Sequence, residues 1–299
     1  MNKVIWSIFL LLTLISVVHG QKQQAVIRFG IIADPQYADT DPEGTRFYRN
    51  SLDKLKTAVT DFNQQQVPFL INLGDVTDRN PRDLDTVLSV INQFSGKVYT
   101  IPGNHDYKNI TDNGVLYKKL GMPAPYYSFK KGNWRFIMLN TNEIAAYSNV
   151  KNTDNERELR EMMTNIKVAG RKNGYDYNGG ISQKQLVWLK KELEKADRKN
   201  DNVLIFSHHP LGCAPGLTAL NDQEIMSVIT PFKCVKGVIA GHHHPGAFCE
   251  IGTIPCIVLQ GMVETKDQNS YGVIELYPDK FVLKGQGRML SKTINFKSH

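Results

Sequence analysis

Apolar runs alternate with amphipathic stretches in the first half of the chain. Short apolar runs at residues 26–33, 69–73 and 98–101 predict buried strands. Residues 45–65 and 82–94, which lie between these runs, carry apolar side chains three or four positions apart, as a helix with one buried face does. An alternation of strand, helix and strand is typical of α/β proteins.

The pattern changes in the second half, where hairpins and antiparallel strands are expected. The expected elements are a hairpin turning near Gly132-Asn133, a helix over 182–196, strands at 203–206 and 235–240, a helix near 221–230, and antiparallel strands with a turn at Pro278-Asp279. Ser182 and Gln185 have the spacing of a capping box at the start of the helix over 182–196. Together the two halves predict two packed mixed sheets flanked by helices.

A polar segment over residues 142–180 interrupts this pattern within a single expected domain over 21–299. One helix is expected inside the segment, over 156–168, with Gly, Asn and Tyr on either side of it. A connection of this length in a compact domain is either a lid or binding loop, or a mobile segment. We expect a lid.

The first twenty residues have the composition of a secretory signal peptide. Lys3 gives a positive start, residues 4–18 are almost wholly apolar, and the polar Gln21 follows Gly20. We expect cleavage after Gly20 and a secreted or periplasmic protein without a stable membrane anchor. An uncleaved anchor is the alternative, although the apolar run is short for a membrane span of about 20 residues.

Composition and charge narrow the classes of partner. The chain has 299 residues, of which 41% are apolar, enough for a sizeable core in one or two domains. Its net charge of +7 becomes +6 without residues 1–20, which hold one Lys and no acidic residue. The basic residues are dispersed rather than gathered in an arm or stripe, so we expect no nucleic-acid partner. A mild positive charge suits a small anionic substrate, and we expect a monomer.

Four cysteines fit an oxidising compartment. Gly252-Thr253 predicts a hairpin with a two-residue loop, which places Cys249 opposite Cys256. A cross-strand disulfide between these two is geometrically possible, and two small buried thiols are the alternative. Cys213 and Cys234 are expected to be free.

Metal-capable side chains follow five of the predicted strands. The five segments are Asp34-Pro35-Gln36, Gly74-Asp75, Gly103-Asn104-His105-Asp106, Ser207-His208-His209-Pro210 and Gly241-His242-His243-His244. All six histidines outside the first twenty residues and the terminal His299 lie in these segments. Because ligands bind beyond the strand ends in sheets with helical crossovers, the segments are expected to meet at one metal site.

Spacing distinguishes the side chains within a segment. In extended chain, residues two positions apart point the same way. Asp34 and Gln36 are therefore expected to face one side together, as are His242 and His244. By the same argument His243 points in another direction. It is expected to contact the metal ligands rather than the metal, or to lie on the surface.

The order D-x-Q, GD, GNHD, H-x-P and GHxH resembles the five motifs of the calcineurin-like metallophosphoesterases, over residues 29–288. This resemblance implies two metal ions in a four-layer α/β/β/α sandwich. By position, the first metal would take Asp34, Gln36, Asp75 and His244, and the second would take Asp75, Asn104, His208 and His242. His208 rather than His209 is the expected ligand, because the family's histidine stands two positions before the proline.

The family's chemistry gives these residues roles. Two cations neutralise phosphate charge and activate water for attack on phosphorus. His105 matches the family's residue that protonates or stabilises the leaving oxygen, Asp78 could orient His105, and Arg79 could contact a phosphate oxygen. For Asp78 and Arg79 the alternative is a pair of surface charges. Gln36 stands where most of the superfamily has histidine, and its amide oxygen favours Mn²⁺ over zinc, with Mg²⁺ or Fe²⁺ as further options.

A narrower resemblance joins the chain to the manganese-dependent ADP-ribose/CDP-alcohol diphosphatases. It rests on FGIIADPQYAD, GTRFYRNSL, NGGISQKQLVWL and the stretch that begins GMVETKDQNS. The resemblance implies hydrolysis of the pyrophosphate bond in nucleotide diphosphate compounds, with Arg46, Arg49 and the 142–180 segment as candidate substrate contacts. Arg46 and Arg49 could equally be surface residues of a helix. A broad or cyclic-nucleotide phosphodiesterase or phosphatase, and a non-catalytic metal- or nucleotide-binding protein, are the alternatives.

Overall fold

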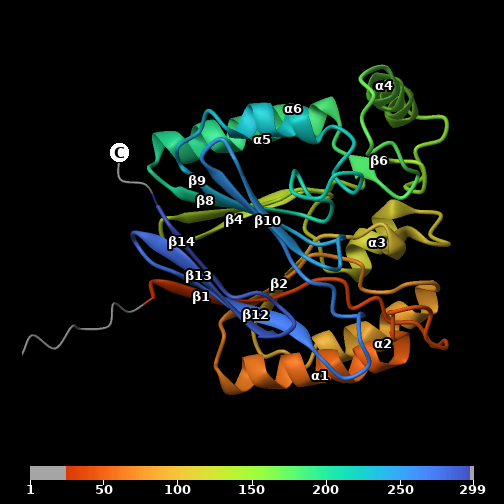
Figure 1. The fold of residues 1–299 in the computed structure, drawn as a ribbon, viewed down its shortest axis with the longest axis vertical. Helices are drawn as coiled ribbons and strands as arrows, with labels where there is room; N and C mark the ends of the chain where they lie inside the picture. The colour runs from red at the N-terminus through yellow and green to blue at the C-terminus, as the bar shows by residue number, and fades with distance from the viewer. Residues whose placement is uncertain (1–24, 297–299) are drawn as a thin grey trace, which may run out of the picture.

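Two six-stranded mixed sheets pack face to face in the computed structural model, which describes residues 25–296 (Figure 1). The first sheet has the order β14 (Lys292–Asn295), β13 (Lys280–Gly287), β12 (Ser270–Leu276), β1 (Ile27–Ile32), β2 (Phe69–Asn72) and β3 (Lys97–Thr100). The second has the order β10 (Ala247–Ile251), β11 (Ile254–Val258), β9 (Val235–Ala240), β8 (Asn202–Ser207), β5 (Trp134–Met138) and β4 (Tyr127–Lys131). Aromatic rings join the two sheets: Phe29 of β1 contacts Phe136 of β5 and Phe206 of β8, with ring centroids 5.5 and 6.2 Å apart.

Helices cover the outer face of each sheet (Figure 1). The helices α1 (Tyr48–Gln64) and α2 (Pro81–Ile91) lie against the first sheet, and α5 (Gln183–Arg198) and α6 (Asp222–Ile229) lie against the second. Their buried sides are the apolar faces seen in the sequence, such as Leu55 and Phe62 of α1 and Leu189 and Leu193 of α5. The four-layer α/β/β/α sandwich is confirmed.

Parallel pairing places the ends of several strands at one edge. β1, β2 and β3 are mutually parallel in the first sheet, and β5, β8, β9 and β11 are parallel in the second. In Figure 1, β1 runs from left to right, toward the side on which α3 (Asn113–Lys119) and β6 (Ile144–Ala145) lie. The segments after β1, β2 and β3 therefore emerge on the right-hand side of Figure 1. The segments after β8 and β9 emerge there too, because His208 and His244 lie beside Asp75.

The polar segment over 142–180 folds against this side. Its ends are joined by pairing of β6 with β7 (Gly179–Gly180), and it contains the helix α4 (Asp154–Val168). Whether it moves as a lid remains a prediction.

The start of α5 shows half of the expected capping box. The Ser182 hydroxyl accepts from Gln185 N at 3.1 Å, as expected. The Gln185 side chain does not return this contact; it donates to Asn140 O and Glu143 Oε2, and Ser182 N donates to Glu143 Oε2 at 3.0 Å. A carboxylate brought in by the 142–180 segment replaces the local partner, which the spacing alone could not reveal.

The hairpin of β10 and β11 has the predicted register, with Cys249 opposite Cys256. Neither of the two alternatives for this pair holds, because Cys249 forms a disulfide with Cys213 while Cys256 is a free thiol. The expectation that Cys213 is free is wrong. Cys234 and Cys256 are free and buried. The loop after β8 brings Cys213 against the hairpin, and hairpin register carries no information about that approach.

Within the described part of the chain, no helix has the length and apolar composition needed to cross a bilayer. The expected signal peptide lies outside residues 25–296.

Candidate metal centre

All five strand-end segments meet at one edge of the sandwich, the right-hand side in Figure 1. Two clusters of possible metal ligands result, each with its ligand atoms within 4.8 Å of one another: Asp34, Asp75 and His244, and His208, His209 and His242. The amide residues Gln36 and Asn104 contact members of these clusters. The structure thus brings together all seven residues expected to bind metal, while their roles as ligands remain a prediction.

Asp75 lies at the junction of the two clusters. Its Oδ2 accepts from Gln36 Nε2 at 2.8 Å and lies 3.4 Å from His208 Nε2. Its Oδ1 accepts from the backbone N–H of His105 at 2.9 Å. A carboxylate that contacts both groups is suited to the bridging position that the family resemblance implies.

The second cluster converges on one amide oxygen. Asn104 Oδ1 lies 3.1 Å from His208 Nε2 and 3.0 Å from His242 Nδ1. The neighbouring His209 is also buried, but its ring nitrogens have other partners: Nδ1 lies 3.0 Å from Thr141 Oγ1, and Nε2 lies 3.2 Å from Tyr177 O. His208 is therefore better placed than His209 to bind a cation, in agreement with the expected assignment.

Strained backbone aims these side chains. Asp34, Gln36, Asp75 and His242 all have positive φ, between 42° and 68°. Such conformations cost about 1–3 kcal/mol each in non-glycine residues and cluster at functional sites. Glycine is required at Gly103 next to them, because a Cβ there would lie 2.1 Å from Asp75 Oδ1.

One buried oxygen atom at the site has no hydrogen-bond partner, which indicates whether the site suits a cation. Gln36 is 1% exposed and uses its Nε2 to donate to Asp75, while its Oε1 has no hydrogen-bond partner. A buried carbonyl oxygen without a donor is costly, and a metal ion can satisfy it. Carboxylate and amide oxygens with imidazole nitrogens form a donor set that suits Mn²⁺. The residues present therefore fit a pair of divalent cations.

Electrostatics also favours positive charge here. Burial alone would lower the pKa of His208, but the Asp75 carboxylate outweighs it and raises that pKa to about 9. The pKa of His244 is likewise raised to about 9, where burial is outweighed by hydrogen bonds to Asp34 and Glu264. The pKa of His209 is lowered to about 3 by burial and by the neighbouring His208. The carboxylates thus draw positive charge into the site, and His209 remains neutral.

Glu264 also belongs to the site, although no role was predicted for it from the sequence. Its Oε1 lies 2.7 Å from His244 Nδ1, and the other ring nitrogen, Nε2, lies 3.7 Å from Asp34 Oδ1. A carboxylate on the far nitrogen fixes the orientation of a metal-binding histidine. Glu264 lies within the stretch GMVETKDQNS that carried the narrower resemblance, and this was the available signal.

Asp106 holds two of the strand-end segments together. Its Oδ1 accepts from the backbone N–H groups of Val76 and Thr77 at 2.8 and 3.0 Å, and its Oδ2 accepts from Gly103 N at 2.9 Å. The last residue of GNHD therefore fixes the loop that carries Asp75.

The three predicted catalytic residues lie together, because both His105 and Arg79 contact Asp78. His105 Nδ1 lies 2.9 Å from Asp78 Oδ1, so the expected orienting contact is present. Arg79 donates to Asp78 and Glu43 and lies over the Tyr48 ring, and it does not line the cavity beside the metal ligands.

The two candidate substrate arginines also differ. Arg46 lines the cavity beside the metal ligands, with its Nη1 4.0 Å from Asp78 Oδ1. Arg49 instead pairs with the exposed Asp39 and Asp41. Arg46 is therefore the one of this pair that the structure places where a phosphate could reach it.

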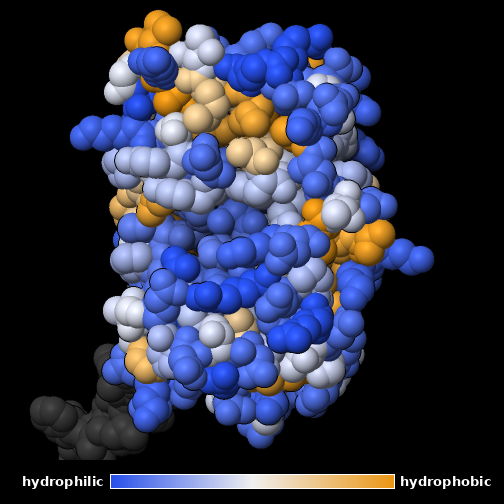
Figure 2. Space-filling view, turned by 90° about the vertical axis from the view of Figure 1, so that its right-hand side faces the viewer, coloured by the Kyte–Doolittle hydropathy of each residue, from blue (hydrophilic) through white to orange (hydrophobic). Residues whose placement is uncertain are grey.

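A cavity of about 580 Å³ opens beside these residues. It is lined by Gln36, Arg46, Asp75, Asn104, His105, Tyr177, Leu217, His242, His243, His244, Pro245 and Glu264. Figure 2 faces this side of the molecule, where hydrophilic residues cover the middle and hydrophobic residues gather in the upper part. His243, expected to support the site or lie on the surface, lines the cavity wall.

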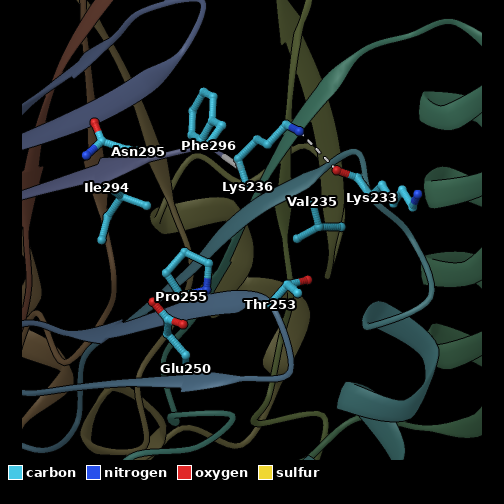
Figure 3. Close-up of a pocket in the computed structure, with 9 residues that line it drawn as sticks. All are labelled: Lys233, Val235, Lys236, Glu250, Thr253, Pro255, Ile294, Asn295 and Phe296. Atoms are coloured by element: carbon cyan, nitrogen blue, oxygen red, sulfur yellow. Dashed lines mark hydrogen bonds between the residues drawn. The ribbon is translucent and has the colours of Figure 1, made fainter. Parts of the chain in front are cut away.

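Another cavity lies away from this chemistry, between β9, the β10–β11 hairpin and the C-terminal strand (Figure 3). It measures about 60 Å³ and includes Lys236, whose Nζ donates to Lys233 O at 3.0 Å. None of the seven expected metal ligands lines it. The larger cavity is the candidate functional site.

A profile described as calcineurin-like phosphoesterase matches residues 27–246. The chain belongs to this family, as its motifs indicated.

Comparison with known proteins shows which members of this family the chain is similar to. The chain is 31% identical to the manganese-dependent ADP-ribose/CDP-alcohol diphosphatase of Oryza sativa subsp. japonica, over 94% of this chain and 98% of that protein. It is 29% identical to the Homo sapiens protein of the same name, over 93% of this chain and 95% of that one. Among solved structures, a dimetal phosphatase from Danio rerio matches with a TM-score of 0.83 at 28% identity, covering 92% of this chain and 100% of that one. These similarities confirm the narrower resemblance.

Proposed function

We propose that this protein hydrolyses the pyrophosphate bond of ADP-ribose, CDP-alcohols or similar nucleotide diphosphate compounds, with two divalent cations, Mn²⁺ above all. The observation that carries the proposal is the convergence of the donor groups around Asp75, with the unpartnered Oε1 of Gln36 among them. The names of the relatives, which match more than nine-tenths of the chain, support the substrate class.

The seven converging residues would hold the cations. Asp34, Gln36, Asp75 and His244 would bind the first, and Asp75, Asn104, His208 and His242 the second. When bound, the cations supply charge stabilisation at the phosphoryl oxygens and activate water as the nucleophile. In the reaction, the oxygen of water bonds to one phosphorus, and the bond between that phosphorus and the bridging oxygen breaks. The bridging oxygen leaves on the other phosphate and takes up a proton, while the attacking water loses one. The products are a nucleoside monophosphate and a phosphorylated partner.

His105 serves the leaving oxygen in this proposal. Asp78 holds the imidazole through Nδ1 and leaves Nε2 to donate a proton to that oxygen. The His105 side chain is 24% exposed and lines the cavity, whereas that of Asp78 is 5% exposed, so one can contact substrate and the other acts through it.

Within residues 25–296, Arg46 is the one arginine or lysine among the residues that line the cavity, and its Nη1 lies 4.0 Å from Asp78 Oδ1. A guanidinium binds phosphoryl oxygens through two parallel hydrogen bonds, which would hold the diphosphate in register with the donor groups. Arg79, bound to Glu43, is a poorer candidate for that contact.

Product identification tests the proposal. The purified protein is incubated with ADP-ribose or CDP-choline, with and without Mn²⁺, and the products are resolved by chromatography. The expected result is Mn²⁺-dependent release of AMP and ribose 5-phosphate, or of CMP and phosphocholine. Faster turnover of cyclic AMP or p-nitrophenyl phosphate would indicate the phosphodiesterase or phosphatase alternative. Binding of Mn²⁺ without turnover of any of these compounds would indicate the non-catalytic one.

We also propose that the protein acts outside the cytoplasm as a monomer. The apolar start of the chain and the Cys213–Cys249 disulfide support export, because disulfides persist in oxidising compartments. Mass spectrometry of the mature protein tests the first point, with Gln21 as the expected first residue. Light scattering tests the second.

A further inference from the structure

Two tyrosine rings of the 142–180 segment stack on each other at the surface. The ring centroids of Tyr175 and Tyr177 are 5.0 Å apart, and the rings are inclined by 10°. Tyr175 is 48% exposed and Tyr177 is 43% exposed. A pair of parallel aromatic rings left open to solvent offers a flat face to a further planar group.

One ring of this pair, that of Tyr177, lies in the wall of the candidate active site. Tyr177 lines the 580 Å³ cavity, with its ring centroid 6.2 Å from that of His242. Leu217 and Pro245 line the same cavity and add apolar surface. Arg46 instead lies near Asp78, so the aromatic and the cationic residues of the wall have different neighbours.

Hydrogen bonds join the tyrosine segment to the metal centre. Asn178 Nδ2 donates to Asn173 O at 2.8 Å and to Gly216 O at 2.9 Å, and its Oδ1 lies 3.1 Å from His242 Nε2. The carbonyl of Tyr177 lies 3.2 Å from His209 Nε2. The backbone at Tyr177 and Asn178 is therefore held in position relative to the donor groups, so this part of the segment needs little ordering when a ligand binds.

We propose that Tyr177, backed by Tyr175, is the nucleobase-binding surface of this site. The inference rests on the proposed function and extends it, since it assigns the base of the nucleotide diphosphate to the His242 side of the cavity. Stacking on an aromatic ring accepts any base, because every base has a π-face. The surface therefore accommodates adenine and cytosine alike, without a set of base-specific hydrogen bonds.

The test compares two probes that differ only in the base. AMP and ribose 5-phosphate are titrated into the Mn²⁺-loaded protein by isothermal titration calorimetry. Stacking predicts that AMP binds about tenfold or more tightly than ribose 5-phosphate. Tyr177→Ala should bring this ratio close to one, whereas Tyr177→Phe, which keeps the ring, should preserve it. Phe248→Ala is the matched control, because Phe248 is an exposed aromatic residue (38%) that does not line the cavity.

A ratio near one in the wild-type protein, or an unchanged ratio in Tyr177→Ala, would overturn the inference. The affinities for ribose 5-phosphate and the circular dichroism of each variant show whether the phosphate site and the fold are intact. Failure of the proposed function is a separate result. It would appear as no hydrolysis of ADP-ribose or CDP-choline by the wild-type protein, whatever the ratio of the two affinities.

Discussion

Asn178 Oδ1 lies 3.1 Å from Nε2 of His242, although the two residues are 64 positions apart in the chain. The other ring nitrogen of His242 faces Asn104 Oδ1 at 3.0 Å, inside the metal centre. An acceptor on the outer nitrogen fixes which ring nitrogen carries the proton and holds the imidazole in place. A residue of the polar 142–180 segment thus supports the expected second metal position.

Asn178→Ala is therefore expected to weaken Mn²⁺ binding by about 10- to 100-fold, as loss of such supporting contacts does. Calorimetric titration of Mn²⁺ into the metal-free protein measures this directly. Asn173→Ala is the matched control, since Asn173 is a buried amide of the same segment that donates to Ala219 O at 2.7 Å. An equal loss of affinity in both variants would mean that Asn178 only maintains the local fold.

His105→Ala should lower kcat on ADP-ribose by about 10²- to 10⁴-fold, the usual contribution of a positioned acid or base. Its affinity for Mn²⁺ should stay close to that of the wild type, because the imidazole side chain is not among the expected ligands. The loss of kcat should be much smaller with p-nitrophenyl phosphate, because its p-nitrophenolate leaving group needs no proton. Equal losses on both substrates would contradict the role of His105 as a proton donor.

Metal removal is expected to destabilise the wild-type protein and to leave Asp75→Ala unaffected. A cation that binds only the folded state raises the free energy of unfolding, by about 2.7 kcal/mol at a concentration 100 times Kd. Melting curves with Mn²⁺ and with EDTA measure the difference. Asp75→Ala should also be inactive, yet in metal-free buffer it should melt close to the wild type. A large loss of stability in that buffer would show that Asp75 is chiefly structural.

Lys54 is expected to make stability rise with pH above about 8. Its ammonium group is buried and donates to the carbonyls of Glu264 and Thr265. Burial, together with the charge of Arg288, lowers the pKa of Lys54 from 10.5 to about 8. The unfolded chain therefore binds more protons than the folded one between these values, so the cost of the buried charge is full below pH 8 and disappears toward pH 10.5.

Urea unfolding of the wild type and of Lys54→Met at pH 7.5 and at about pH 10 tests this sign. The free energy of unfolding of the wild type should increase relative to that of the variant at the higher pH. A difference that is constant or shrinks would contradict the lowered pKa.

The Cys213–Cys249 disulfide closes a loop with a sequence separation of 36. Cys213→Ser/Cys249→Ser should lower the free energy of unfolding by about 2–4 kcal/mol, because the open chain gains entropy when unfolded. Denaturant unfolding with and without a reducing agent checks the value. Cys234→Ala is the control, since Cys234 has no disulfide partner and reduction should leave its stability difference from the wild type unchanged.

Much of the fold could be predicted because its signals are local. The helix over 182–196 could be predicted from its apolar spacing and from Ser182, and in the structure it spans Gln183–Arg198. The turn at Gly132-Asn133 joins β4 to β5 as expected, since glycine takes the positive φ of 56° that the turn requires. Periodicity and turn residues act over a few positions, so they do not depend on the rest of the chain.

The partners of particular side chains could not be predicted in this way. Cys249 was placed correctly opposite Cys256, yet its disulfide partner is Cys213, which reaches it from another loop. Glu264 and Asn178 contact metal-site histidines from segments to which spacing assigned no chemistry. Arg46, Arg49 and Arg79 were all candidates for contact with the substrate, and of these three only Arg46 lines the cavity.

By itself, the sequence determined which donor groups are available and that each follows a strand, since strand periodicity and motif order are properties of consecutive residues. The meeting of Asp34, Asp75 and His244 was inferred from strand ends, whereas the distances among them were decided by the packing of two sheets. The packing also decided contacts such as the stacking of Tyr175 on Tyr177 and the position of Tyr177 beside His242. The physical reason is that the path of each loop depends on everything packed against it, and no short stretch of residues specifies that surrounding.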